Sequence, residues 1–164
     1  MRKQEKSLNM TVLMTPDMAN FSGAVHGGAL LKLLDQVAYT CAARYCKSYV
    51  VTAFLDSVFF KEPIKVGELV TFKAHINYVG RSSMEVGIKV IAEDIQTQTE
   101  RHTNSCYFTM VAKDSEGKTI PVPRLTLETE TETKRFKAAE MRKALRAEIA
   151  ERTKAIHVGS ADED

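Results

Sequence analysis

The sequence predicts an α+β domain in which an antiparallel sheet wraps around one long buried helix, with an added helix at the C-terminal end. Three observations predict this fold. A run without helix breakers follows Gly27 and Gly28 and is apolar at nearly every helical angle. Four segments rich in Val, Ile, Phe, Tyr and Thr come next, separated by turn signals. A strongly charged stretch of helical composition closes the chain.

The first elements are a short strand and the long helix. We expect the strand at residues 8–14, because the sequence Thr-Pro-Asp that follows favours a turn. The helix is expected over residues 29–46, where the only charged residues are Lys32, Asp35 and Arg44. This composition predicts a helix buried on nearly all sides rather than an amphipathic one.

Four further strands are expected within residues 49–63, 68–80, 83–96 and 101–114. Turns containing glycine or proline separate them, and their order suggests antiparallel pairing as a meander. These strands supply the sheet that would enclose the helix.

The chain is divided into a domain at residues 8–124 and a charged tail at residues 125–164. Acidic residues precede the expected tail helix, and residues 134–154 hold eight Lys or Arg against three Glu, a net charge of +5. A solvated helix that docks on the core or on a neighbour through Phe136, Leu145 and Ile149 is favoured over a phosphate-binding role.

Composition excludes several classes of protein. A formal net charge of +2 argues against a nucleic-acid-binding surface. The three cysteines, at positions 41, 46 and 106, form no CxxC pair, so buried thiols are expected rather than disulfides or a zinc site. No segment resembles a signal peptide or a membrane span, and a cytoplasmic protein is expected.

The residues that indicate chemistry lie between Asn20 and Asp35. A helix N-terminus opened by Gly27 and Gly28 offers backbone N–H groups to an oxyanion. Asp35 is either a structural partner, for example of Lys32, or a catalyst whose pKa partial burial would raise. The Asn20 side chain could orient a water or hold a carbonyl, or it could only form a turn.

His26 precedes the two glycines and has two possible roles. Its ring either closes hydrogen bonds around the loop, the more economical interpretation, or acts as a general base. The other histidines show no metal-ligand spacing, so no metal is expected.

The run NFSGAVHGGALLKLLDQVAY, followed by FKEPIKVGELV, VGRSSMEVGIKV and RHTNSCYFTMVA, resembles the acyl-CoA thioesterases of the hotdog superfamily, specifically the YciA-like and animal cytosolic acyl-CoA hydrolases. The resemblance implies hydrolysis of acyl-CoA to a free acid and CoA. It also implies a dimer with a continuous sheet, often assembled as a trimer of dimers into a homohexamer. Asn20 and Asp35 would then be the catalytic pair, contributed by opposite subunits.

The resemblance assigns the remaining site residues. The backbone N–H of Gly27 or Gly28, in the loop with His26, would polarise the thioester carbonyl. Coenzyme A would be bound by Arg81, Ser82 and Ser83, with Lys61 a weaker candidate. No cofactor is expected, because coenzyme A is part of the substrate and the product. Two alternatives stay open: a 3-hydroxyacyl-thioester dehydratase that uses His26, and a non-catalytic acyl-CoA sensor.

Overall fold

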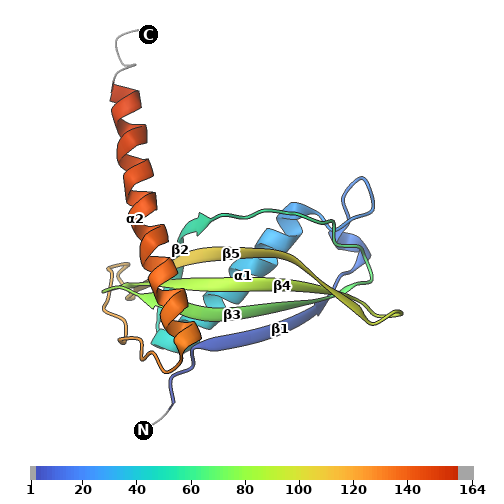
Figure 1. The fold of residues 1–164 in the computed structure, drawn as a ribbon, viewed down its shortest axis with the longest axis horizontal. Helices are drawn as coiled ribbons and strands as arrows, with labels where there is room; N and C mark the ends of the chain where they lie inside the picture. The colour runs from blue at the N-terminus through green and yellow to red at the C-terminus, as the bar shows by residue number, and fades with distance from the viewer. Residues whose placement is uncertain (1–2, 159–164) are drawn as a thin grey trace. The chain divides into compact units, whose positions relative to one another are not determined.

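A computed structural model describes residues 3–158 of the chain. The chain separates into two compact units: the first ends at Thr126 and the second begins at Leu127. The first unit holds a five-stranded antiparallel sheet and the long helix α1 (Gly27–Cys46), and the second holds helix α2 (Glu130–Val158). Figure 1 shows these elements along the chain.

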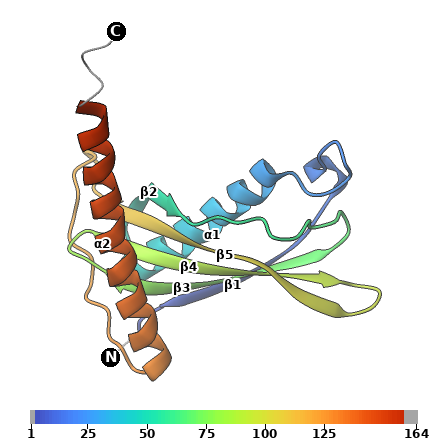
Figure 2. The same cartoon turned by 45° about the horizontal axis from the view of Figure 1, so that its top comes forward.

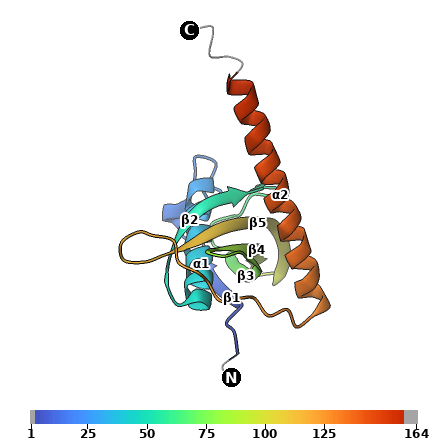
Figure 3. The same cartoon turned by 90° about the vertical axis from the view of Figure 1, so that its left-hand side faces the viewer.

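The sheet has the strand order β1-β3-β4-β5-β2 and curls around α1 (Figure 2). Its strands are β1 (Ser7–Leu13), β2 (Tyr49–Asp56), β3 (Leu69–Val79), β4 (Ser83–Asp94) and β5 (Thr99–Lys113). All neighbouring strands are antiparallel. The α+β prediction of a sheet wrapped around a helix is confirmed, as the view in Figure 3 makes plain.

The core lies between the sheet and one face of α1. Alternate residues of β5 are buried, because successive side chains of a strand point to opposite faces. From Cys106 to Ala112 the buried set faces α1 together with the buried stripe of the helix. That stripe comprises Leu30, Leu34, Val37, Ala38, Cys41, Ala42 and Tyr45.

The opposite face of α1 is open in the single chain, which differs from the predicted all-round burial. Asp35, Gln36 and Tyr39 are exposed there, and Tyr39 packs its ring near that of Tyr49 on the edge strand β2. The apolar residues of the helix therefore lie on two faces, and a single chain covers only the face that packs on the sheet.

The predicted meander is correct for β3, β4 and β5 but wrong for β2. Strand β2 pairs with β5 at one edge of the sheet, while β1 takes the place beside β3. The twelve residues between Asp56 and Leu69 therefore cross from the edge strand β2 to β3, next to the opposite edge, instead of forming a hairpin. Residue pattern alone does not distinguish these pairings, since both leave the same faces buried.

A β-bulge in β3 brings a buried polar pair together. Asn77 Nδ2 donates to Glu85 Oε1 at 3.0 Å, and both side chains are buried. Gly87 lies directly against the Asn77 amide, so a Cβ at position 87 would overlap it. Glycine is therefore needed here for close approach and not for its backbone angles.

Helix α2 begins with a capping arrangement. Thr129 Oγ1 accepts from the Glu132 N–H at 3.1 Å, and the Glu132 carboxylate accepts from the Glu128 N–H at 2.7 Å. Leu145 and Ile149 are exposed in the single chain. Within residues 3–158 no helix has both the length and the apolar character required to cross a bilayer.

Candidate active site

Asn20 organises the loop that leads into α1. Its Oδ1 accepts from the backbone N–H of Ser22 (2.9 Å) and of Ala24 (3.1 Å) and from the Ser22 hydroxyl (2.8 Å). The turn-forming role expected as an alternative is therefore present. The side-chain amide nitrogen has no partner among residues 3–158, so it is available to donate to a ligand.

His26 is the N-cap of α1. Its Nδ1 accepts from the Gly28 N–H at 2.9 Å, and a Cβ at position 28 would crowd the ring. Glycine at 28 thus permits the cap. Of the two N–H groups proposed for an oxyanion, that of Gly28 already donates to His26, whereas that of Gly27 has no partner within the described part of the chain.

A cavity of about 360 Å³ adjoins this helix end and the Asn20 loop. Its walls come from the loop, from the first turn of α1 and from the β2–β3 connection. They are formed by Asn20, Ser22, Ala24, Val25, Gly27, Leu30, Phe60, Glu62, Pro63 and Ile64. The lining is mostly apolar with a few polar groups, as is usual for a site that takes a small organic ligand.

Asp35 lies in a second pocket, on the open face of α1. Thr52 Oγ1 on β2 donates to Asp35 Oδ1 at 2.5 Å. The pocket has a volume of about 580 Å³ and is lined by Met10, Asp35, Gln36, Tyr39, Thr40, Tyr49, Val50, Val51 and Thr52. The carboxylate is oriented by the edge strand, and no ion pair with Lys32 forms among the described residues.

One chain does not bring Asn20 and Asp35 into the same pocket. Asp35 is eight residues beyond Gly27, about 12 Å along the helix axis. Each pocket therefore holds one of the two predicted catalytic side chains.

The predicted coenzyme A residues lie at two ends of the sheet. The exposed Arg81 and the half-buried Ser82 form the turn between β3 and β4, and Ser83 begins β4. Lys61 is exposed in the connection before β3, so the eleven residues of β3, about 36 Å, separate it from Arg81. A single chain does not gather these four residues.

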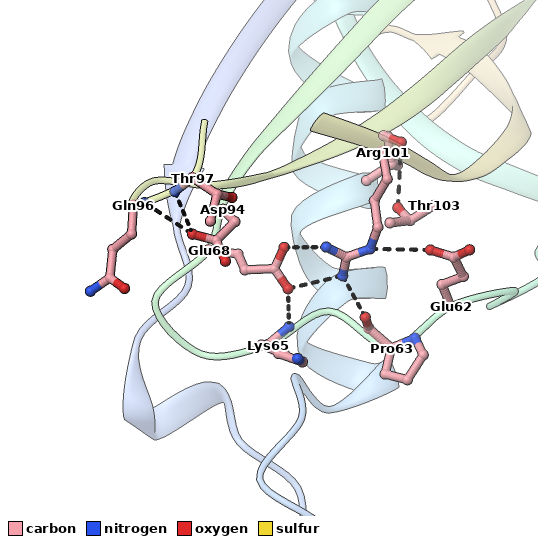
Figure 4. Close-up of polar contacts among 10 residues, drawn as sticks. Glu62, Pro63, Lys65, Glu68, Asp94, Gln96, Thr97, Arg101 and Thr103 are labelled. Atoms are coloured by element: carbon pink, nitrogen blue, oxygen red, sulfur yellow. Dashed lines mark hydrogen bonds and ion pairs between the residues drawn. The ribbon is translucent and has the colours of Figure 1, made fainter. Parts of the chain in front are cut away.

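Sequence reasoning missed two polar contacts at the site. One is the hydroxyl of Thr52, which no local motif marked. The other is Arg101 on β5, whose guanidinium contacts Glu62, Pro63 and Glu68 in the connection that forms one wall of the smaller cavity (Figure 4). Both contacts join residues far apart in the sequence, so spacing alone gave no signal for them.

The three cysteines are free thiols; Cys41 and Cys106 are buried, as expected, whereas Cys46 is half-buried. Burial raises the pKa of the Cys41 and Cys106 thiols to about 12, with Arg44 opposing the rise at Cys41. Burial likewise raises the pKa of the half-buried Cys46. Within residues 3–158 no group of three or more His, Cys, Asp or Glu side chains is placed to hold a metal ion.

Known proteins resemble this chain in sequence. Residues 22–99 match the thioesterase superfamily. The protein VdlD of Helicobacter pylori (strain ATCC 700392 / 26695) is 54% identical over 139 residues, which cover 85% of this chain and 79% of VdlD.

Solved structures agree in fold. An apo-hexameric acyl-CoA thioesterase is 34% identical, with a TM-score of 0.85 over 89% of this chain and 94% of its own. The acyl-CoA hydrolase of Staphylococcus aureus, solved with butyryl coenzyme A and coenzyme A, is 31% identical, with a TM-score of 0.80 over 93% and 96%. That hydrolase has also been solved as variants with an aspartate, a threonine or an asparagine replaced by alanine.

The sheet curled around α1 is thus the hotdog fold. The chain belongs to the thioesterase superfamily, among the acyl-CoA thioesterases.

Proposed function

We propose that this chain hydrolyses acyl-CoA thioesters to a free carboxylic acid and coenzyme A, at sites that two copies of the chain complete together. The observation that carries the proposal is the Asp35 carboxylate, held by the Thr52 hydroxyl at 2.5 Å on the open face of α1. A carboxylate oriented in this way next to a free pocket is suited to work as a base or a nucleophile.

Hydrolysis at this site has two possible routes. In the first, Asp35 takes a proton from water as the water oxygen bonds to the thioester carbonyl carbon. In the second, the carboxylate oxygen itself bonds to that carbon, and water cleaves the resulting anhydride. In both, the carbon–sulfur bond breaks, coenzyme A leaves as the thiolate and a proton neutralises it.

Asn20 would act on the carbonyl side of the reaction. Its amide nitrogen and the Gly27 N–H are donors without partners within the described chain, on the wall of the smaller cavity. Donors that face a developing oxyanion contribute about 10²- to 10³-fold each in rate. The apolar remainder of that cavity would take the acyl chain.

The separation of Asn20 from Asp35 favours a site shared between subunits. In the S. aureus hydrolase, the altered aspartate follows the altered asparagine by 15 positions, and the altered threonine follows that aspartate by 17. Asn20, Asp35 and Thr52 have the same spacings, which supports the assignment of these three residues. The open face of α1 and the edge strand β2 would pair with a second copy, and three such dimers would form a hexamer.

Coenzyme A would contact residues from both subunits. Arg81, with Ser82 and Ser83, would meet the nucleotide from one end of the sheet, and Lys61 would do so from the other, across the subunit boundary. The reaction needs no further cofactor, and we place it in the cytoplasm.

The first test is release of coenzyme A thiol from acyl-CoAs of increasing chain length. Asp35→Asn should lower kcat at least about 100-fold and leave coenzyme A binding nearly intact. Asp114→Asn, in the turn after β5 and outside both pockets, is the matched control and should keep full activity. Tight binding without turnover by the unaltered chain would favour the acyl-CoA sensor instead.

A second test addresses the shared site. Coexpression of Asn20→Ala and Asp35→Asn chains produces mixed dimers in which one site carries both substitutions and the other carries neither. Random pairing should restore about a quarter of the sites. No recovery in isolated mixed dimers would show that one chain supplies both residues.

The dehydratase alternative depends on His26. Because Nδ1 of His26 already accepts from Gly28, only its second ring nitrogen could move a proton. Loss of dehydration in His26→Ala, with no hydrolysis by the unaltered chain, would support that alternative.

A further inference from the structure

Arg101 uses all of its guanidinium nitrogens on one segment, the connection between β2 and β3 (Figure 4). Nη1 donates to Glu68 Oε2 at 2.5 Å, and Nη2 donates to Glu68 Oε1 at 2.9 Å and to the Pro63 carbonyl at 2.7 Å. Nε lies 3.1 Å from Glu62 Oε2. The Glu68 side chain is only 7% exposed, whereas the Arg101 side chain is 32% exposed, so the guanidinium closes a buried carboxylate off from the surface.

The segment held by Arg101 is bonded in turn to the Asn20 loop. The Ile64 carbonyl, one residue after Pro63, accepts from the Val25 N–H at 2.7 Å. Ala24, which precedes Val25, bonds to Asn20 twice: Asn20 N–H donates to the Ala24 carbonyl at 2.7 Å, and Ala24 N–H donates to Asn20 Oδ1 at 3.1 Å. Three consecutive contacts therefore link the Arg101 guanidinium to the Asn20 amide.

The same segment forms one wall of the cavity that Asn20 lines. Phe60, Pro63 and Ile64 belong to that wall, and the Phe60 ring lies over Gly27. Displacement of the connection would therefore move the wall and the Asn20 loop together.

An arginine is required for this geometry. A planar guanidinium can bind both oxygens of one carboxylate and still donate to two other acceptors, whereas a lysine ammonium is a single compact charge. Consistent with this contact, hydrogen bonds from Arg101 keep the pKa of Glu68 below its usual range, against the opposing effect of burial.

We propose that Arg101 is the positioning residue for Asn20 and for the acyl-side wall of the active site, acting through the Pro63–Ile64 backbone and the Val25–Ala24 contact. The proposal rests on the proposed function for its catalytic consequence, but not for its structural one. Arg101 does not reach the reacting atoms itself.

The structural consequence is tested by hydrogen–deuterium exchange on the full chain. Arg101→Lys keeps a cation beside the buried Glu68, and the double variant Arg101→Met with Glu68→Gln removes both charges, so neither leaves a lone buried carboxylate. Both Arg101 variants should speed backbone amide exchange in residues 18–26 and 61–68. The amides of β3 and β4 should stay protected. The matched control is Arg44→Met, because the ion pair of Arg44 with Glu5 is exposed.

The catalytic consequence is tested by a double-mutant cycle with Asn20→Ala. Arg101→Lys should lower kcat about 10- to 100-fold, as expected for misplacement of a catalytic group, and Arg44→Met should not. In the Asn20→Ala background the same substitution should cost less than threefold, because the two residues act in series.

Two results would overturn the proposal. One is unchanged exchange in residues 18–26 for both Arg101 variants. The other is an equal loss of kcat from Arg101→Lys with and without Asn20, which would show that Arg101 acts elsewhere. Absence of hydrolysis by the unaltered chain would refute the proposed function alone, because the exchange result does not depend on turnover.

Discussion

Replacement of Thr52 by valine tests how the Asp35 carboxylate is held. Valine keeps the shape of threonine and removes only the hydroxyl, which donates to Asp35 Oδ1 at 2.5 Å. A hydrogen bond to a charged group contributes about 1.5–3 kcal/mol, and each 1.36 kcal/mol changes a rate about tenfold. Because Asp35 is exposed in the single chain, we expect the lower end of this range, a fall in kcat of about 10- to 30-fold.

The assay is steady-state release of coenzyme A thiol, with kcat and KM separated. Thr52→Ser, which keeps the hydroxyl, should retain most of kcat and is the control. KM should change little in either variant, because the contact orients the carboxylate rather than binding the substrate. If Thr52→Val keeps kcat within twofold of the unaltered chain, the Asp35 carboxylate is not held in its catalytic orientation by this hydroxyl.

Three further predictions concern stability and reactivity. Gly87→Ala should lower the melting temperature by about 5–10 °C, since its Cβ displaces the Asn77 amide from a buried carboxylate, and the added loss should shrink in an Asn77→Ala background. The pKa of Glu68 is lowered in the folded chain, so its ionised carboxylate contributes all of its stabilisation above about pH 4.5. This contribution to the free energy of unfolding is lost as the pH falls through the lowered folded pKa. Glu68→Gln should therefore flatten the acid limb of a denaturation curve measured against pH. Cys41 and Cys106, with pKa raised to about 12, should resist alkylation at pH 8 in the folded chain and react once it is unfolded in urea.

Much of the fold could be predicted because the turn residues and the hydrophobic pattern of the sequence indicate the same helix and strands. The apolar run after Gly28 predicted α1 within two residues of its start, and the glycine and proline turns separated the strands. The place of β2 could not be predicted, because its pairing with β5 depends on how the sheet curls and not on the composition of the strand.

The site was harder to predict than the fold. Asn20, in the loop before the glycine-opened helix, and Asp35, within that helix, stood out as polar residues, but their partners did not. Thr52 contacts Asp35 from a strand 17 residues further on, and Arg101 reaches Glu68 across 33 residues. Local sequence patterns do not indicate contacts between residues so far apart along the chain.

The strand order has a consequence for folding. Strands β3, β4 and β5 follow one another along the chain, so their hairpins close short loops and can form early. Both edges, β1 beside β3 and β2 beside β5, need pairings across roughly 60 residues and can be added only once that central sheet exists. Asn20, Asp35 and Thr52 all lie on or between these edge strands. Recovery of the candidate site during refolding should therefore lag behind formation of the sheet that carries it.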